Sequence, residues 1–89
     1  MKTYYIGTDA HKYSTTLKVM NKNKIIRCEE FATEIPNFLS LFDELNGKIH
    51  MIIEESTLSG WLYCNLYDKV ENFVVCDPRK NKAIFAGQY

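Results

Sequence analysis

The sequence predicts an α/β fold in which a mixed sheet carries helices on its faces. Three runs rich in β-forming residues come first, and two helical patterns then alternate with two short apolar runs. Hairpin strands followed by β-α-β crossovers give a mixed sheet, so the expected order is β-β-β-α-β-α-β. The chain has 89 residues, which suits a single domain over residues 1–89.

Composition narrows the classes of function. The apolar content of 46% fits a globular protein, and eleven basic residues balance eleven acidic ones. Because the net charge is zero, a polyanionic partner has to meet a local basic cluster. No run approaches the ~20 apolar residues of a membrane span, and no secretion signal is recognisable, so no membrane partner is expected. The three cysteines are widely spaced and form no metal-binding pair, which favours a cytoplasmic protein. Each cysteine is expected to be a small buried apolar side chain.

The first three strands are expected at residues 3–9, 15–20 and 25–31. In the second, Leu17 and Val19 alternate with polar residues, so one face is expected to meet solvent. The polar residues 21–24 predict a hairpin turn. The third strand carries charge on both faces, which is typical of a sheet edge.

Two helices and two further strands are expected after these. Thr33 is expected to cap the first helix, Pro36 fits its first turn and Asn46-Gly47 ends it. The second helix is expected over residues 58–67. Its core side would hold Leu58, Trp61, Leu62 and Leu66. The apolar runs at 49–53 and 73–76 indicate strands covered on both faces, and residues 79–89 are expected to begin another helix.

Acidic residues stand at the predicted carboxyl ends of three strands: Asp9, then Glu54 and Glu55, then Asp77. Carboxylates that converge on one sheet edge repel one another unless a cation neutralises them, and hard oxygen ligands suit Mg²⁺ or Mn²⁺. Such ions can promote phosphodiester cleavage. The pattern therefore predicts metal-assisted phosphoryl transfer, with Asp9 and Glu54 as the favoured ligands. For Asp77 the favoured interpretation is a turn before Pro78. For Glu55 it is a solvent-facing position near a helix start.

Five residues near this edge are candidates for nucleic-acid binding: His11, Lys12, Arg79, Lys80 and Lys82. His11 follows Asp9 closely and could touch substrate phosphate or metal-bound water. The basic cluster after Pro78 would make phosphate binding salt-dependent. A solvated turn and a solvated helix start are the alternative interpretations.

Three blocks of the chain resemble a known family. Residues 6–16 (IGTDAHKYSTT), 53–63 (IEESTLSGWLY) and 74–82 (VVCDPRKNK) are similar, in order, to motifs of the DEDD-type transposases of bacterial insertion sequences, relatives of the pilin-gene invertase. The resemblance covers nearly the whole chain. It implies an RNase H-like fold akin to that of Holliday-junction resolvases, and an enzyme that carries out DNA transposition and recombination.

The resemblance also implies an Asp-Glu-Asp-Asp site for Mg²⁺ or Mn²⁺. Its first acid carries over to Asp9 and its second to Glu54, with Glu55 as the less favoured register. The last two acids are expected just beyond Tyr89, together with a C-terminal domain whose serine is not Ser56 or Ser59. The implied partners are DNA, a guide RNA in some members, and further copies of the protein. On this basis the chain is a truncated N-terminal catalytic domain that is inactive by itself and binds metal weakly or not at all.

Other classes of function are also compatible with the sequence. One is a stand-alone resolvase-like nuclease, which would need a third acid, and only Asp77 is on offer. Another is a non-catalytic remnant that binds DNA or dimerises through its edge strand or the helix that carries Trp61. An actin-like kinase is disfavoured because residues 10–13 lack the phosphate loop that such enzymes place after the first strand.

Overall fold

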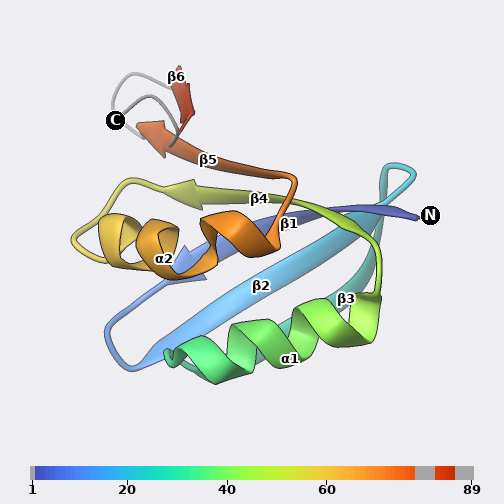
Figure 1. The fold of residues 1–89 in the computed structure, drawn as a ribbon, viewed down its shortest axis with the longest axis horizontal. Helices are drawn as coiled ribbons and strands as arrows, with labels where there is room; N and C mark the ends of the chain where they lie inside the picture. The colour runs from blue at the N-terminus through green and yellow to red at the C-terminus, as the bar shows by residue number, and fades with distance from the viewer. Residues whose placement is uncertain (1, 78–81, 86–89) are drawn as a thin grey trace.

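The computed structural model describes residues 2–77 and 82–85, which form a six-stranded mixed sheet with two α-helices and one short 3₁₀ helix (Figure 1). The strands lie in the order β3-β2-β1-β4-β5-β6. The α/β class and the order of the seven expected elements agree with the sequence analysis. A further strand, β6 (Lys82–Phe85), follows them.

Strand β6 corrects the expectation of a helix after Pro78. It pairs antiparallel with β5, and Val75 lies opposite Ile84. The segment Ala83-Ile84-Phe85 is rich in strand-forming residues, and pairing covers an edge of β5 that would otherwise be open.

The N-terminal half is an antiparallel meander of β1 (Thr3–Ala10), β2 (Ser14–Asn21) and β3 (Lys24–Ala32). Lys22 and Asn23 connect β2 to β3 with positive φ angles of 52° and 65°. Two such residues in a row form the tight turn whose twist matches that of paired strands. Strand β3 lies at the sheet edge, which confirms the prediction from its charge pattern.

The second half adds parallel strands through helical crossovers. After β3 the chain forms α1 (Ile35–Leu45) and then β4 (Lys48–Glu54), which pairs parallel to β1. It continues through α2 (Ser59–Leu66) and the 3₁₀ helix η1 (Tyr67–Lys69) into β5 (Asn72–Asp77), which pairs parallel to β4. No helix in the described residues is long and apolar enough to cross a membrane.

Both helices cover the same face of the sheet, so the expectation that β4 and β5 are covered on both faces is wrong for the described residues. Alternate strand residues such as Ile6, Leu17 and Met51 join Phe38 of α1 and Leu62 of α2 in one buried core. The residues between them face away from the helices and are largely exposed. The two crossovers step in the same direction, from β3 to β4 and from β4 to β5, and right-handed connections that step the same way lie on the same face.

The ends of α1 show how short-range contacts fix its place. Thr33 does not cap the helix as predicted. Glu34 holds the cap position without a side-chain bond, while the Thr33 hydroxyl donates to the carbonyl of His11 at 2.6 Å. At the other end Asn46 adopts the left-handed conformation. A Cβ on the next residue, Gly47, would lie 2.5 Å from the Lys2 carbonyl oxygen, so this position has to be glycine.

Arg27 ties the edge strand to α1. Its Nη2 lies 3.1 Å from Glu44 Oε1 on the helix and 3.4 Å from Glu29 Oε2 on its own strand. The hydrogen bond to Glu44 raises the pKa of Arg27 above its ordinary value, desolvation works against that effect, and Glu29 adds to it. The charge on the helix-covered side of β3 is thereby paired.

Two expectations about individual side chains are also wrong. Leu62 and Leu66 are fully buried under α2, but Trp61 is 41% exposed because it lies off the line that joins them on the helix surface. The cysteines are free, and none is buried: Cys28 and Cys64 are exposed and Cys76 is partly so. Cys28 and Cys76 belong to the uncovered face of the sheet.

Candidate functional site

Asp9 and Glu54 stand side by side at the carboxyl ends of two parallel strands. Thr8 of β1 lies opposite Ile53 of β4, so the next residue on each strand is one of the two acids. Thr8 and Ile53 are buried toward the helices, so alternation turns Asp9 and Glu54 to the uncovered face, where both are exposed. Neighbouring strands are about 4.8 Å apart, which brings the two carboxylates within reach of one ion.

His11 is already in contact with Asp9. Its Nε2 lies 3.1 Å from Asp9 Oδ1, and both side chains are about 70% exposed. A histidine placed there orients the carboxylate and adds a positive charge when it is protonated. His11 is therefore in direct contact with one of the two expected metal ligands.

The two loops at this edge are held by short-range bonds. Thr33 fixes the loop after β1 through the His11 carbonyl, and Thr33 Oγ1 also lies 2.8 Å from Thr15 Oγ1. After β4, the hydroxyl of Ser59 donates to the Ser56 carbonyl at 2.8 Å and closes a compact turn before α2. Both loops line a hollow of about 420 Å³ next to the acids. Its lining residues are Ala10, His11, Lys12, Ser56, Thr57 and Leu58.

Glu55 and Asp77 do not join this pair. Asp77 is buried and lies on the helix-covered face of β5, the opposite side of the sheet from Asp9 and Glu54. Glu55 follows the end of β4, is exposed, and donates its backbone N–H to the Cys76 carbonyl at 2.8 Å. The alternation of the strands therefore favours Glu54 over Glu55 as the partner of Asp9.

Of the basic residues predicted to bind nucleic acid, only some lie in the part of the chain that the structure describes. Lys12 is exposed in the loop after β1, and its Nζ lies 5.3 Å from the centre of the Tyr13 ring. Lys82 begins β6 and lies opposite Asp77 in the strand register. Arg79 and Lys80 lie outside the described residues.

The two acidic side chains carry the type of donor atom that a hard divalent cation prefers. Asp9 and Glu54 offer carboxylate oxygens, the ligands that Mg²⁺ and Mn²⁺ prefer. Within residues 2–77 and 82–85, no group of three or more acidic, histidine or cysteine side chains is arranged to hold a metal.

The uncovered face also carries an aromatic pair that the sequence analysis did not single out as a site. The rings of Tyr5 and His50 stack at 4.9 Å with an angle of 17° between their planes. Tyr5 precedes Asp9 by four residues, so an alternating strand places both on one face. The four-residue spacing of Tyr5 and Asp9 could be read from the sequence as a sign that they share a face. The pairing of Tyr5 with His50 could not, because it depends on the register of β1 and β4.

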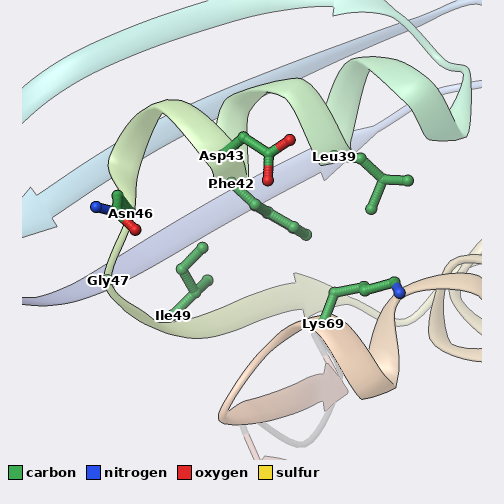
Figure 2. Close-up of a pocket in the computed structure, with 7 residues that line it drawn as sticks. All are labelled: Leu39, Phe42, Asp43, Asn46, Gly47, Ile49 and Lys69. Atoms are coloured by element: carbon green, nitrogen blue, oxygen red, sulfur yellow. The ribbon is translucent and has the colours of Figure 1, made fainter.

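A second hollow of about 420 Å³ lies at the opposite end of β4, between the end of α1 and η1 (Figure 2). Figure 2 shows Asp43 and Lys69 on either side of it, with Phe42 and Ile49 forming apolar walls. Asp43, Asn46 and Lys69 among apolar side chains give no recognisable catalytic or metal-binding pattern. The carboxyl edge of the sheet is the better candidate site.

Comparisons with known proteins add no assignment. A scan of the chain against known protein families matches none of them, and a search of curated proteins finds no relative.

Proposed function

We propose that this chain is the part of an RNase H-like catalytic domain that carries the first two metal ligands of a DEDD-type transposase. In the parent protein, the domain would cut and transfer DNA strands with the help of Mg²⁺ or Mn²⁺. The observation that carries the proposal is the register of β1 and β4, in which the residues after the Thr8–Ile53 pair are Asp9 and Glu54. Asp9 and Glu54 are also the residues onto which the sequence resemblance carries the family's first two acids.

Asp9 and Glu54 would hold the metal, and His11 would orient the Asp9 carboxylate through its contact at 3.1 Å. When bound, the ion supplies charge neutralisation at the scissile phosphate and activation of the attacking nucleophile. The exposed position of both carboxylates leaves room for a phosphodiester to approach from the uncovered face. Lys12, exposed on the loop after β1, would meet an adjacent phosphate.

The proposal assigns the remaining acids, the guide RNA where one is used, and the oligomer to the parent protein. Mg²⁺ is usually held by one or two carboxylates together with water and substrate phosphates, so Asp9 and Glu54 suit the protein's part of such a site.

DNA cleavage by the parent protein tests this function. Asp9→Asn and Glu54→Gln should each reduce Mg²⁺-dependent cleavage to background. Glu30→Gln is the matched control, because Glu30 is an exposed acid of the same face, opposite Thr16, which in turn lies opposite Asp9. Equal losses in all three variants, or full activity in Asp9→Asn, would contradict the proposal.

A further inference from the structure

The uncovered face of the sheet is arranged in rows of paired residues that run across four strands. The row nearest the amino ends of the parallel strands consists of Met20, Tyr5, His50 and Asn72. The middle row consists of Lys18, Gly7, Ile52 and Val74. The row at the carboxyl ends consists of Thr16, Asp9, Glu54 and Cys76. The candidate metal ligands and the aromatic pair therefore share one surface.

The aromatic pair is held in a fixed orientation. Asn72 Nδ2 lies 2.8 Å from His50 Nδ1, and because an amide NH₂ is a donor, Nδ1 accepts and the neutral ring carries its proton on Nε2. Tyr5 lies against the His50 ring and remains 47% exposed. The pair thus leaves about half of the Tyr5 side chain in solvent and offers one N–H donor on His50.

The space between the aromatic pair and the acids is open. Gly7 lies between Tyr5 and Asp9 on β1, and a Cβ added there would meet nothing within 4 Å. Its φ is not positive, so the backbone does not require glycine at this place. Glycine in the middle of a strand weakens it and often marks a point where a ligand comes close to the backbone.

Positive and negative side chains are also separated along β1 on the uncovered face. Lys48, opposite Thr3, is exposed at the aromatic end of the face, and Lys18, opposite Gly7, is exposed in the middle row. Asp9 and Glu54 make the other end acidic. A polyanion that follows β1 would be attracted at the aromatic end without metal, and would approach the acidic end only when a cation is present.

We infer that Tyr5 and His50 form a base-stacking subsite for single-stranded DNA that runs along β1 away from the Asp9–Glu54 pair. The inference rests on the proposed function, because Asp9 and Glu54 define where the reacting phosphate lies. The four residues from Tyr5 to Asp9 span ~13 Å, so the stacked base lies more than one nucleotide from the reacting phosphate. A base stacks on the exposed part of the Tyr5 ring, His50 Nε2–H donates to an oxygen of the base or phosphate, and Lys18 meets the backbone.

Binding of a short fluorescent oligothymidine to the 89-residue chain in EDTA tests this subsite. Tyr5→Ala and Tyr5→Leu should weaken binding roughly five- to 150-fold, the range for loss of one stacked base, whereas Tyr5→Trp should retain it. Tyr67→Ala is the matched control. Tyr67 is 53% exposed and lies 5.2 Å from the Tyr63 ring, but it is on η1 and not on the uncovered face. It should bind like the wild type.

Salt dependence separates stacking from charge. Lys18→Gln should lower the slope of log affinity against log salt by ~0.7 per lost phosphate contact, and Tyr5→Leu should leave that slope unchanged. Absence of binding by the wild-type chain, equal losses for Tyr5→Leu and Tyr67→Ala, or tighter binding of oligouridine than of oligothymidine would overturn the inference. Because the assay contains no metal, these outcomes are independent of whether Asp9 and Glu54 bind an ion.

Discussion

The two faces of the sheet differ in almost every physical property. On the covered face, Ile6, Leu17 and Met51 are fully buried against two helices. On the other face, the described part of the chain leaves Tyr5 and Ile52 partly in solvent and collects the acids Asp9 and Glu54 at one end. Strand alternation alone separates the residues that stabilise the fold from those that can bind a ligand. Substitutions on one face should therefore change stability, and substitutions on the other should change binding.

The largest contrast is expected between two apolar truncations. Phe38→Ala should lower the free energy of unfolding by roughly 3–5 kcal/mol, because Phe38 is fully buried and packs edge-on against Phe31. Ile52→Ala, at a side chain that is 38% exposed, should cost about 1 kcal/mol or less. Urea unfolding monitored by circular dichroism measures both values. Similar costs for the two variants would mean that the second face is also packed.

Alanine substitutions at two glycines should have opposite effects on stability. Gly47→Ala should destabilise the chain by about 1–3 kcal/mol, because the new Cβ would lie 2.5 Å from a backbone oxygen. Gly7→Ala should instead stabilise the isolated chain by roughly 0.5–1 kcal/mol, since the site is open and alanine loses less backbone entropy in a strand. Thermal unfolding of the two variants gives the signs. A destabilising Gly7→Ala would show that something already lies against the backbone there.

A pair of threonines gives a smaller effect. The Oγ1 of Thr8 is buried on the covered face and has no hydrogen-bond partner in the described residues. Thr8→Val should raise the free energy of unfolding by about 1 kcal/mol, because it removes an unsatisfied polar atom at almost constant volume. Thr16→Val, at an exposed position opposite Asp9, should change it by no more than ~0.5 kcal/mol. Equal effects in urea titrations of the two variants would contradict this account of Thr8.

The smallest change is expected at the acidic end of the uncovered face. Asp9→Asn should alter the stability of the metal-free chain by no more than ~0.5 kcal/mol, because its carboxylate is largely exposed and its contact with His11 is at the surface. A thermal scan in EDTA checks the value. A large loss of stability would assign Asp9 a structural role.

Local patterns in the sequence were sufficient for the order of the elements. Alternation at Leu17 and Val19 and the apolar stripe of α1 depend only on neighbouring residues, and these elements lie where they were expected. The strand-end position of Asp9 and Glu54 was also readable from the sequence, because each acid closes an apolar run. Their placement on the same face follows from the parallel register of β1 and β4.

The incorrect expectations concern features that depend on long-range packing. Thr33 bonds the His11 loop instead of capping α1, and Trp61 faces outward because the direction of α2 against the sheet selects Leu62 and Leu66. The uncovered face could not be foreseen, since it depends on which side each crossover passes. Strand β6 similarly depends on its pairing with β5, which its short run of strand-forming residues does not specify.

The most direct test of the central claim is a Mn²⁺ titration of the chain followed by the line widths of its backbone amide signals in NMR. Broadening should begin at Asp9, Glu54 and their strand neighbours, and Asp9→Asn should remove it while Glu30→Gln does not. Broadening that is scattered over other exposed acids such as Asp68 and Glu71, and that persists in Asp9→Asn, would contradict the assignment of a metal site to the uncovered face.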